Sequence, residues 1–360
     1  MQFLRERLTT ALAFVACLAA ASVLRAQDST VALPKIILPP VEIHGFLEVY
    51  YRSGDPLIKD GYRLRKADLK FTGAISPRLR WRVTFDAAKP LQLNTATGTS
   101  ADSAAVSSVG VDQRSRILQD AALTYSFNRA FILDVGQQIV PLSLEGTIAT
   151  WNVETIERTN FVVERSRAVG LGDVRDIGAS ANGEVSGLEY HVGMFDEMGD
   201  AGGGIDANPQ KAVMARSAYH PPFFNRLQVG GSAGFEGGPP TQEKQRAGTE
   251  IQYRDTKLVL RGETMAARDG LLRRFGWYGL SAYRVHPDLQ LVARYDWWDR
   301  DTRAESALIN AEQVQIVGGA SYFIENGNAK IALNIIRQTF PHVSTIPSAT
   351  FGLLAFQALF

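Results

Sequence analysis

The sequence predicts an all-β protein, a transmembrane antiparallel β-barrel of about sixteen strands with an inward-folded loop after the fifth strand. Three observations support this fold class. Apolar and polar residues alternate with a period of two along most of the chain, as in strands that have one apolar face. Short turns and longer loops alternate between the candidate strands. The last segment is amphipathic and ends in an aromatic residue, Phe360.

The N-terminal region has the features of an export signal. Arg5 and Arg7 form a basic start, residues 8–21 are apolar, and small residues precede a cleavage site expected after Ala26. The apolar stretch is shorter than the ~20 residues that a spanning helix needs, which disfavours a membrane anchor. We therefore expect these residues to be removed on export.

Composition excludes several classes of protein. Cleavage after Ala26 would remove Cys17, the only cysteine, so the mature chain could hold no disulfide or thiolate metal site. The formal charge of the whole chain is +1, and removal of three arginines and one glutamate with the signal changes it to −1. This balance does not indicate nucleic-acid binding. The expected organisation is a signal peptide (1–26), a flexible Pro-rich lead-in (27–40) and an outer-membrane β-barrel (41–360).

The alternation is clearest in the third candidate strand, where Leu79, Trp81, Val83 and Phe85 oppose Arg80, Arg82, Thr84 and Asp86. The segments with this pattern span 41–53, 62–75, 79–89, 117–127, 131–142, 175–185, 188–197, 211–221, 227–236, 245–254, 258–267, 275–285, 289–299, 312–324, 329–339 and 350–360. Period-two alternation alone is also typical of soluble sandwiches.

The connections distinguish the two architectures. Short turns are expected at 76–78, 128–130, 186–187, 255–257, 286–288 and 325–328. Longer loops are expected at 54–61, 90–116, 143–174, 198–210, 237–244, 268–274, 300–311 and 340–349. Short turns on one side and long loops on the other are the arrangement of a membrane barrel. Because a sheet in lipid cannot leave an edge unpaired, the strand that ends in Phe360 is expected to close the barrel and to act as an assembly signal.

One long loop is rich in apolar residues. Residues 143–174 contain Trp151, Ile156, Phe161 and Val162, which are unlike the contents of a solvated loop. We expect this segment to fold back into the lumen and narrow it, as loops do in many large barrels. The alternative is a cap on the barrel rim or a subunit contact.

Parts of the chain resemble the phosphate-selective porin O and P family. The resemblance is carried by Val135–Glu145, Ile156–Thr159, Arg165–Ser166, Arg175–Gly178, Arg63–Gly73 and Glu189–Asp196. It implies a sixteen-stranded outer-membrane porin of a Gram-negative-type bacterium, commonly trimeric, that passes anions. Leu142 replaces the usual Phe, and lysines are few in the second half of the chain. The family's lysine-rich funnel and arginine ladder therefore cannot be mapped residue by residue.

The polar residues that alternate with the apolar ones are expected to face the lumen. The basic residues among them are the candidate anion-binding residues of a pore constriction, because basic side chains can select anions there. Facing lipid would cost an Arg or Lys about 2–4 kcal/mol near the midplane, so alternation places these side chains in the lumen. The candidates are Lys66, Lys70, Arg80, Arg82, Arg261 and Arg294 on strands, and Arg158, Arg165 and Arg167 on the long loop. The same regions carry the acids Asp68, Asp86, Glu263, Asp296, Glu154, Glu157 and Glu164. The alternative is that the basic residues simply pair with these acids.

No motif indicates catalysis. Residues 230–234 match a Gly-x-Ser-x-Gly pattern, but the Gly- and Pro-rich residues that follow cannot open the helix that a nucleophile elbow needs. The five histidines are scattered, without the spacing of a zinc site. Four aromatic residues near strand ends, Trp277, Tyr278, Trp297 and Trp298, are expected to form an interfacial girdle.

We interpret the chain as a porin, not an enzyme, that lets small hydrophilic solutes diffuse through the outer membrane, with anions such as phosphate as its expected solutes. The alternatives are an outer-membrane barrel enzyme of lipase or protease type and a non-conducting structural barrel. The expected partners are outer-membrane lipid, the barrel assembly machinery, small anions and two further copies in a homotrimer. No nucleic acid and no cofactor are expected.

Overall fold

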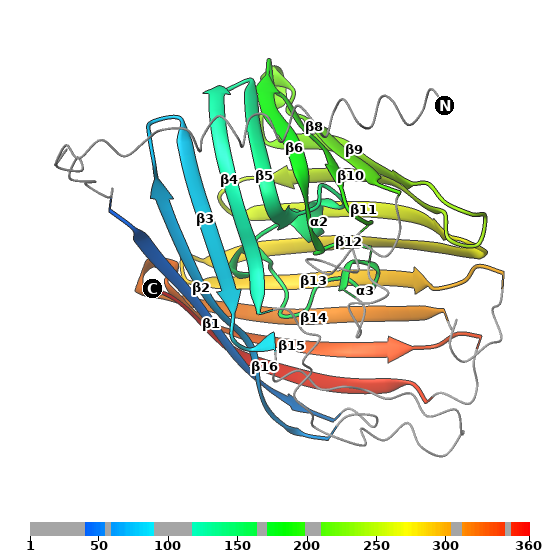
Figure 1. The fold of residues 1–360 in the computed structure, drawn as a ribbon. Helices are drawn as coiled ribbons and strands as arrows, with labels where there is room; N and C mark the ends of the chain where they lie inside the picture. Colours follow the sequence, from blue (N-terminus) through cyan, green and yellow to red (C-terminus); the bar gives the residue numbers. More distant parts are fainter. Residues whose placement is uncertain are drawn as a thin grey trace, which may run out of the picture. The chain divides into compact units, whose positions relative to one another are not determined.

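The computed structural model describes residues 40–54, 59–89, 117–163, 171–198, 210–303, 312–342 and 347–360. The expected signal peptide and nearly all of the lead-in lie outside these ranges. Sixteen antiparallel strands form one closed barrel in which sequence neighbours pair and β1 pairs with β16 (Figure 1). The predicted fold class and strand number are confirmed.

The strands are β1 (Glu42–Ser53), β2 (Gly61–Ala74), β3 (Leu79–Asp86), β4 (Leu118–Asn128), β5 (Phe131–Ile139), β6 (Arg175–Val185), β7 (Leu188–Phe195), β8 (Ala212–Tyr219), β9 (Leu227–Glu236), β10 (Lys244–Arg254), β11 (Leu258–Asp269), β12 (Leu272–His286), β13 (Leu289–Asp299), β14 (Gln313–Ile324), β15 (Ala329–Thr339) and β16 (Ala349–Leu359). Short 3₁₀ turns, η3 (Pro222–Phe224) and η5 (Glu325–Gly327), lie in two of the connections.

The two ends of the barrel sequence meet in the β1–β16 pair. The Gly45 N–H donates to the Phe360 carbonyl at 2.7 Å, and the Phe360 N–H donates to the Gly45 carbonyl at 3.1 Å. A Cβ added to Gly45 would overlap the Phe360 ring in its present position, so a larger residue there would require this exposed ring to move. The terminal residue therefore completes the closure, and neither β1 nor β16 remains an open edge.

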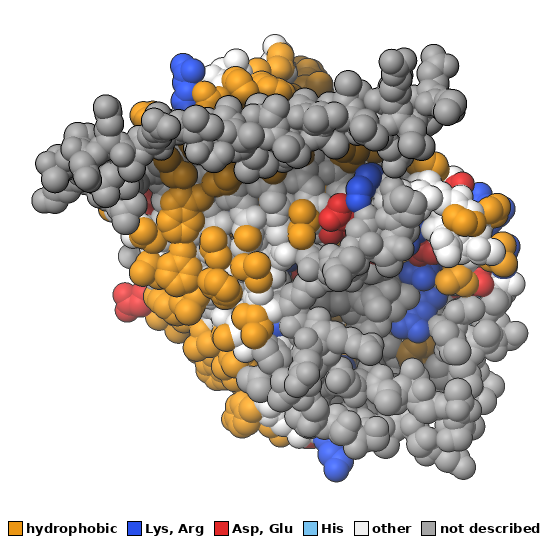
Figure 2. Space-filling model, viewed as in Figure 1, with side chains coloured by type: hydrophobic (Ala, Val, Ile, Leu, Met, Phe, Trp, Pro, Cys, Tyr) orange, Lys and Arg blue, Asp and Glu red, His pale blue; other side chains and the backbone are white. Residues whose placement is uncertain are grey.

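Each strand has one exposed apolar face and one buried face that is rich in polar residues. On β13, Leu291 and Tyr295 are exposed, whereas Val292, Arg294 and Asp296 are buried. Figure 2 shows hydrophobic side chains gathered in a broad field on the outer surface near β2 and β3. Because apolar side chains face lipid in a membrane barrel, the buried face is the one expected to surround the lumen.

Three expectations about element boundaries are wrong. The loop expected at 268–274 is a tight turn, since β11 continues to Asp269 and β12 begins at Leu272, with Gly270 at a φ of 57°. The charged residues there have no apolar alternation, although they pair as a hairpin. β5 ends at Ile139 instead of 142, because Pro141 has no N–H to donate to the ladder. β3 ends at Asp86 instead of 89.

Candidate functional site

The connection between β5 and β6, residues 140–174, contains the short elements α2 (Leu144–Thr147), η2 (Thr150–Asn152) and α3 (Asn160–Val163). We call it the β5–β6 connection; its residues 164–170 lie outside the described ranges. The Ser143 hydroxyl accepts the Gly146 N–H at 3.0 Å and caps α2. The connection is thus locally folded, although it has no long helix or strand.

Two polar side chains of the barrel wall hold the backbone of this connection. The Glu263 carboxylate on β11 accepts the N–H groups of Leu144 at 2.8 Å and Glu145 at 3.2 Å. The Asn334 Oδ1 atom on β15 accepts the Ile156 N–H at 2.7 Å. Glu263 and Asn334 are both buried. Since buried backbone groups need partners, these contacts fix the path of the connection across β11 and β15.

A third anchor lies on β13, between the other two strands. The Asp296 Oδ2 atom accepts the Asn160 N–H at 2.8 Å. The Arg294 Nη1 atom donates to the Thr155 hydroxyl at 2.9 Å and to the Glu157 carbonyl at 2.7 Å. Arg294 and Asp296 are buried, with an N–O distance of 3.6 Å. In this structure Arg294 therefore binds the connection and presents no free charge to water.

Arg261 has a similar environment. Its Nη1 atom lies 3.0 Å from the Glu154 carboxylate in the connection, and Arg254 lies 2.7 Å from the same carboxylate. The Lys330 ammonium donates to the Val153 carbonyl at 3.3 Å. Arg261 is buried, and its charge is opposed by Glu154 at close range. These contacts extend the attachment of the connection over β10, β11 and β15.

Arg158 stabilises the connection from within. Its guanidinium donates to the carbonyls of Glu145 and Ile148 and lies 3.6 Å from the Asp173 carboxylate. The Glu145 carboxylate in turn accepts the Thr159 N–H at 2.8 Å. Arg158 is buried, so it joins the two halves of the connection.

Apolar packing adds to these polar contacts. The Phe161 ring in α3 lies 6.0 Å from the Tyr278 ring and 6.5 Å from the Trp298 ring, all three buried. A Cβ on Gly276 would come within 2.7 Å of the Phe161 Cβ, so glycine is required for this close approach. Tyr278 and Trp298 thus pack against the connection and cannot belong to the expected girdle. Trp277 is exposed on the opposite face of β12.

The candidates Lys66 and Lys70 lie on β2, and Arg80 and Arg82 lie on β3. We call β1, β2 and β3 together the basic wall. Seven basic and four acidic residues occur on these strands, an excess of three positive charges with histidine neutral. They are Arg52, Arg63, Arg65, Lys66, Lys70, Arg80 and Arg82, and Glu42, Glu48, Asp68 and Asp86. Positive charge therefore collects on one part of the barrel.

Two of the predicted residues in the basic wall have acidic partners. The Lys66 ammonium lies 3.1 Å from the Asp86 carboxylate and 3.7 Å from the Asp68 carboxylate. Arg82 lies 2.9 Å from the Asp134 carboxylate on β5. Asp68 and Asp86 are already counted in the wall, so among these pairs only Asp134 lowers its excess of positive charge.

Lys70 and Arg80 differ from the other candidates. Neither has an ion pair or a side-chain hydrogen bond within the part of the chain that the structure describes. Arg80 is exposed and Lys70 is half-buried. Arg165 and Arg167, which sequence reasoning also proposed, lie outside the described residues.

The β5–β6 connection has the opposite charge. Its described part carries four acids and one base, Arg158. Glu154 faces Arg261 and Arg254, and Glu157 lies 3.7 Å from Arg52. The acids of the connection therefore neutralise arginines of the strands. Sequence reasoning kept pairing of the basic residues with acids as an alternative but could not assign the partners. It missed Asn334, since no pattern marks which inward polar residue meets the connection.

Among the described residues, no helix is long and apolar enough to cross a membrane. Within the same ranges, no three side chains of His, Cys, Asp or Glu are grouped so that they could hold a metal ion.

Comparison with known proteins places these features in context. The family model described as phosphate-selective porin O and P matches residues 42–254. The fold is similar to Salmonella typhi OmpF in complex with daunomycin, with a TM-score of 0.61, 13% identity and coverage of 89% of this chain and 98% of that one. It is similar to an anion-selective porin from Comamonas acidovorans, with a TM-score of 0.57, 13% identity and coverage of 89% and 99%. In vitro folded OmpT from Vibrio cholerae, in its trimer form, gives a TM-score of 0.59, 10% identity and coverage of 90% and 100%. No curated protein gives a significant match.

Proposed function

Because the chain belongs to the phosphate-selective porin O and P family, we propose that it passes small hydrophilic anions such as phosphate by passive diffusion. The protein is an outer-membrane porin of a Gram-negative bacterium, and its family and fold indicate a channel rather than an enzyme.

The observation that carries the anion proposal is the excess of three positive charges on the basic wall, in which Lys70 and Arg80 have no described acidic partner. Charges in a narrow, partly dry pore are screened less than charges on an open surface. A few unpaired basic residues can then attract anions at a constriction. Arg158, Arg261 and Arg294 act mainly by positioning the connection, because their buried side chains contact it.

We also propose that the β5–β6 connection lies in the lumen and narrows it. Glu157 contacts Arg52 on β1, and the Ser143 N–H lies 3.4 Å from the Ser232 hydroxyl on β9. These strands are eight positions apart in a closed barrel of sixteen. Contacts with both, on the buried face, support a segment that crosses the interior and leaves the open path beside the basic wall.

For assembly we propose a homotrimer in outer-membrane lipid, inserted by the barrel assembly machinery. The trimer form of Vibrio cholerae OmpT, which shares the fold, is the support for this oligomeric state. Cross-linking of the purified protein in detergent, followed by gel electrophoresis, would test it.

Reversal potentials in a planar bilayer test the proposed selectivity. The wild-type channel is expected to be anion-selective across a salt gradient, and Lys70→Gln together with Arg80→Gln should lower the ratio of chloride to potassium permeability. Arg129→Gln is the control, because Arg129 lies in the β4–β5 turn with an 81% exposed side chain and pairs with Glu184. A cation-selective wild type, or a double variant with an unchanged reversal potential, would contradict the proposal.

A further inference from the structure

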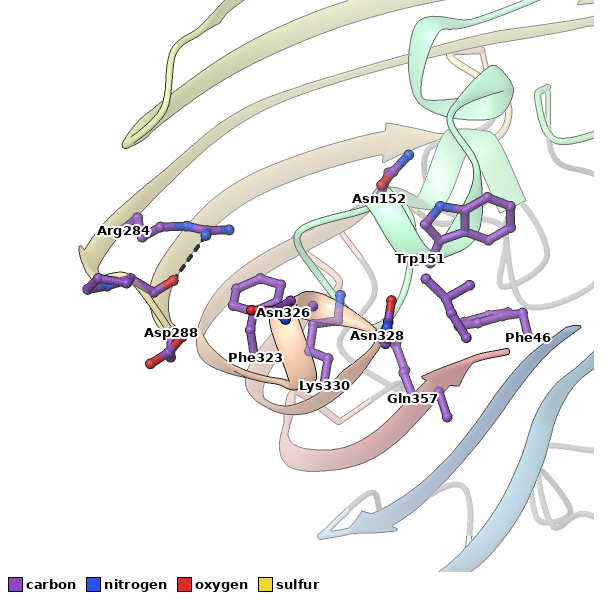
Figure 3. Close-up of a pocket in the computed structure, with 14 residues that line it drawn as sticks. Phe46, Trp151, Asn152, Arg284, Asp288, Phe323, Asn326, Asn328, Lys330 and Gln357 are labelled. Atoms are coloured by element: carbon purple, nitrogen blue, oxygen red, sulfur yellow. Dashed lines mark hydrogen bonds between the residues drawn. The ribbon is translucent and has the colours of Figure 1, made fainter. Parts of the chain in front are cut away.

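A cavity of about 520 Å³ lies at the end of the barrel that carries the short turns (Figure 3). It is lined by the buried faces of β1, β12, β14, β15 and β16, by the turns at Asp288 and Asn326, and by η2 of the β5–β6 connection. Its volume is within the range of about 300–1,000 Å³ of small-molecule sites. The cavity is separate from Lys70 and Arg80, which do not line it.

Two cations and one acid line this cavity, namely Arg284, Lys330 and Asp288. The Arg284 guanidinium lies 4.7 Å from the centre of the Phe323 ring, and the Lys330 ammonium lies 5.9 Å from the same centre. Figure 3 shows Arg284 on one side of the cavity and Trp151 on the other, with Lys330 between them. Among the lining residues the basic side chains exceed the acidic one by one charge, and this excess favours an anion.

The opposite side of the cavity is an aromatic surface. Trp151 is 38% exposed, and its ring centre lies 5.9 Å from that of Phe46, which is buried. The contact with Phe46 holds the Trp151 ring in place while part of it remains open. Rings of this kind bury large apolar areas with little loss of conformational freedom. The Trp151 ring can therefore pack against a solute that has a flat apolar face.

A buried hydrogen-bond acceptor in the lining has no partner. The Gln357 Nε2 atom donates to the Glu48 carboxylate at 2.8 Å, and Glu48 also accepts from Arg65 at 2.8 Å. A carboxylate only accepts, so the amide nitrogen of Gln357 must face it. The Oε1 atom of Gln357, a residue that is 6% exposed, is then left buried and without a described donor. Since buried acceptors are normally paired, this atom is available to accept an O–H or N–H group of a bound molecule.

We propose that this cavity is a binding subsite for an anionic sugar derivative, a sugar acid or a sugar phosphate. Arg284 and Lys330 bind the acidic group, Trp151 packs on the apolar face of the ring, and the Gln357 carbonyl oxygen accepts a sugar hydroxyl. The inference rests on the proposed function, because it adds a solute class to an anion channel. It requires that solutes reach the cavity from the side of the short turns.

Current block in planar bilayers tests the proposal with the full-length porin. Glucuronate and glucose 6-phosphate, added on the side of the short turns, should each interrupt the chloride current, and the pair distinguishes carboxylate from phosphate as the preferred anion. Uncharged glucose and inorganic phosphate should block at least tenfold less well at equal concentration. If glucose blocks as well as glucuronate, or if inorganic phosphate blocks as well as glucose 6-phosphate, the proposal is wrong.

Variants separate the two parts of the subsite. Trp151→Ala should raise the half-blocking concentration of both sugar anions about tenfold, and Trp151→Phe should restore most of the block. Arg284→Gln should abolish the preference of the subsite for the sugar anions over glucose. Arg129→Gln, an exposed arginine outside the cavity, is the matched control. A normal chloride current with no block by either sugar anion would overturn the subsite and leave the porin function intact. A barrel that carries no current would instead overturn the proposed function.

Discussion

Replacement of Glu263 by glutamine should loosen the β5–β6 connection. The carboxylate accepts two backbone N–H groups, at 2.8 and 3.2 Å, and the Tyr278 hydroxyl at 3.3 Å. Glutamine keeps the size of the side chain, but only one of its two terminal atoms can accept. Its NH₂ group would therefore face one of the two backbone donors, and Leu144 or Glu145 would lose its partner.

The expected size of the effect follows from these contacts. A hydrogen bond to a charged group contributes about 1.5–3 kcal/mol, and a buried donor without a partner costs about 1–3 kcal/mol. Loss of one such bond, with the second weakened by loss of the charge, should destabilise the attachment by about 2–4 kcal/mol. This corresponds to about a 30- to 1,000-fold higher population of the detached connection. The anchors at Asn334 and Asp296 remain, so the barrel itself should stay folded.

Single-channel recording measures the consequence. If the connection narrows the lumen, Glu263→Gln should show frequent transitions to a higher conductance, and hydrogen exchange of residues 140–163 should be faster. Glu184→Gln is the matched control, because Glu184 is a carboxylate near the end of β6 that pairs only with Arg129 among the described residues. A variant with wild-type conductance and wild-type exchange would show that the Glu263 contacts do not restrain the connection.

Three further predictions follow from the closure of the barrel, a turn and the connection. Deletion of Phe360 should lower the amount of barrel in the outer membrane while export continues, because it removes both backbone hydrogen bonds to Gly45. Equal amounts in fractionated membranes would refute this. Asp255 accepts backbone N–H groups of its turn and the Tyr253 hydroxyl, which lower its pKa to about 2 from 3.8. The contribution of Asp255 to stability is therefore complete above about pH 4 and is lost as the pH falls through 2. The difference in melting temperature between the wild type and Asp255→Asn should shrink over this range. A constant difference would contradict the assignment. Arg158→Ala leaves two buried carbonyls without a charged donor and should destabilise the connection by about 2–4 kcal/mol, seen as faster proteolysis within residues 140–163; protease resistance equal to that of the wild type would argue against it.

Period-two alternation predicted nearly every strand because the barrel has a uniform physical requirement, an apolar face toward lipid. The prediction of strand boundaries was wrong at strand ends, where side chains no longer need an apolar face toward lipid. The hairpin around Gly270 is charged on both faces, so no alternation marked its strands. The prediction of an aromatic girdle is wrong for Tyr278 and Trp298, for a different reason. Trp297 and Trp298 are consecutive in β13 and must point to opposite faces, so Trp298 could only be buried.

The candidate site was predicted less completely than the fold. Alternation placed Arg261 and Arg294 on the buried face, and the structure confirms that they are buried. It could not show that Glu154, 107 positions before Arg261 in the sequence, would meet that guanidinium. Such pairs depend on the path of the β5–β6 connection, whose sequence has no regular alternation of apolar and polar residues. A single sequence contains no signal for that path, whereas it does contain one for strands.

The chemistry of these anchors explains why net charge is a poor guide to this channel. On the proposed placement in the lumen, the connection does not rely on apolar packing alone, because its backbone binds carboxylates such as Glu263 and its acids bind arginines such as Arg261. Through Glu154 the connection neutralises charge on β10 and β11, and Glu157 pairs with Arg52 of the basic wall, whereas Lys70 and Arg80 have no described acidic partner. Field strength inside a pore depends on these local sums and not on the total of the chain. On the proposed function, the strands that the connection covers decide the selectivity as much as the basic residues themselves do.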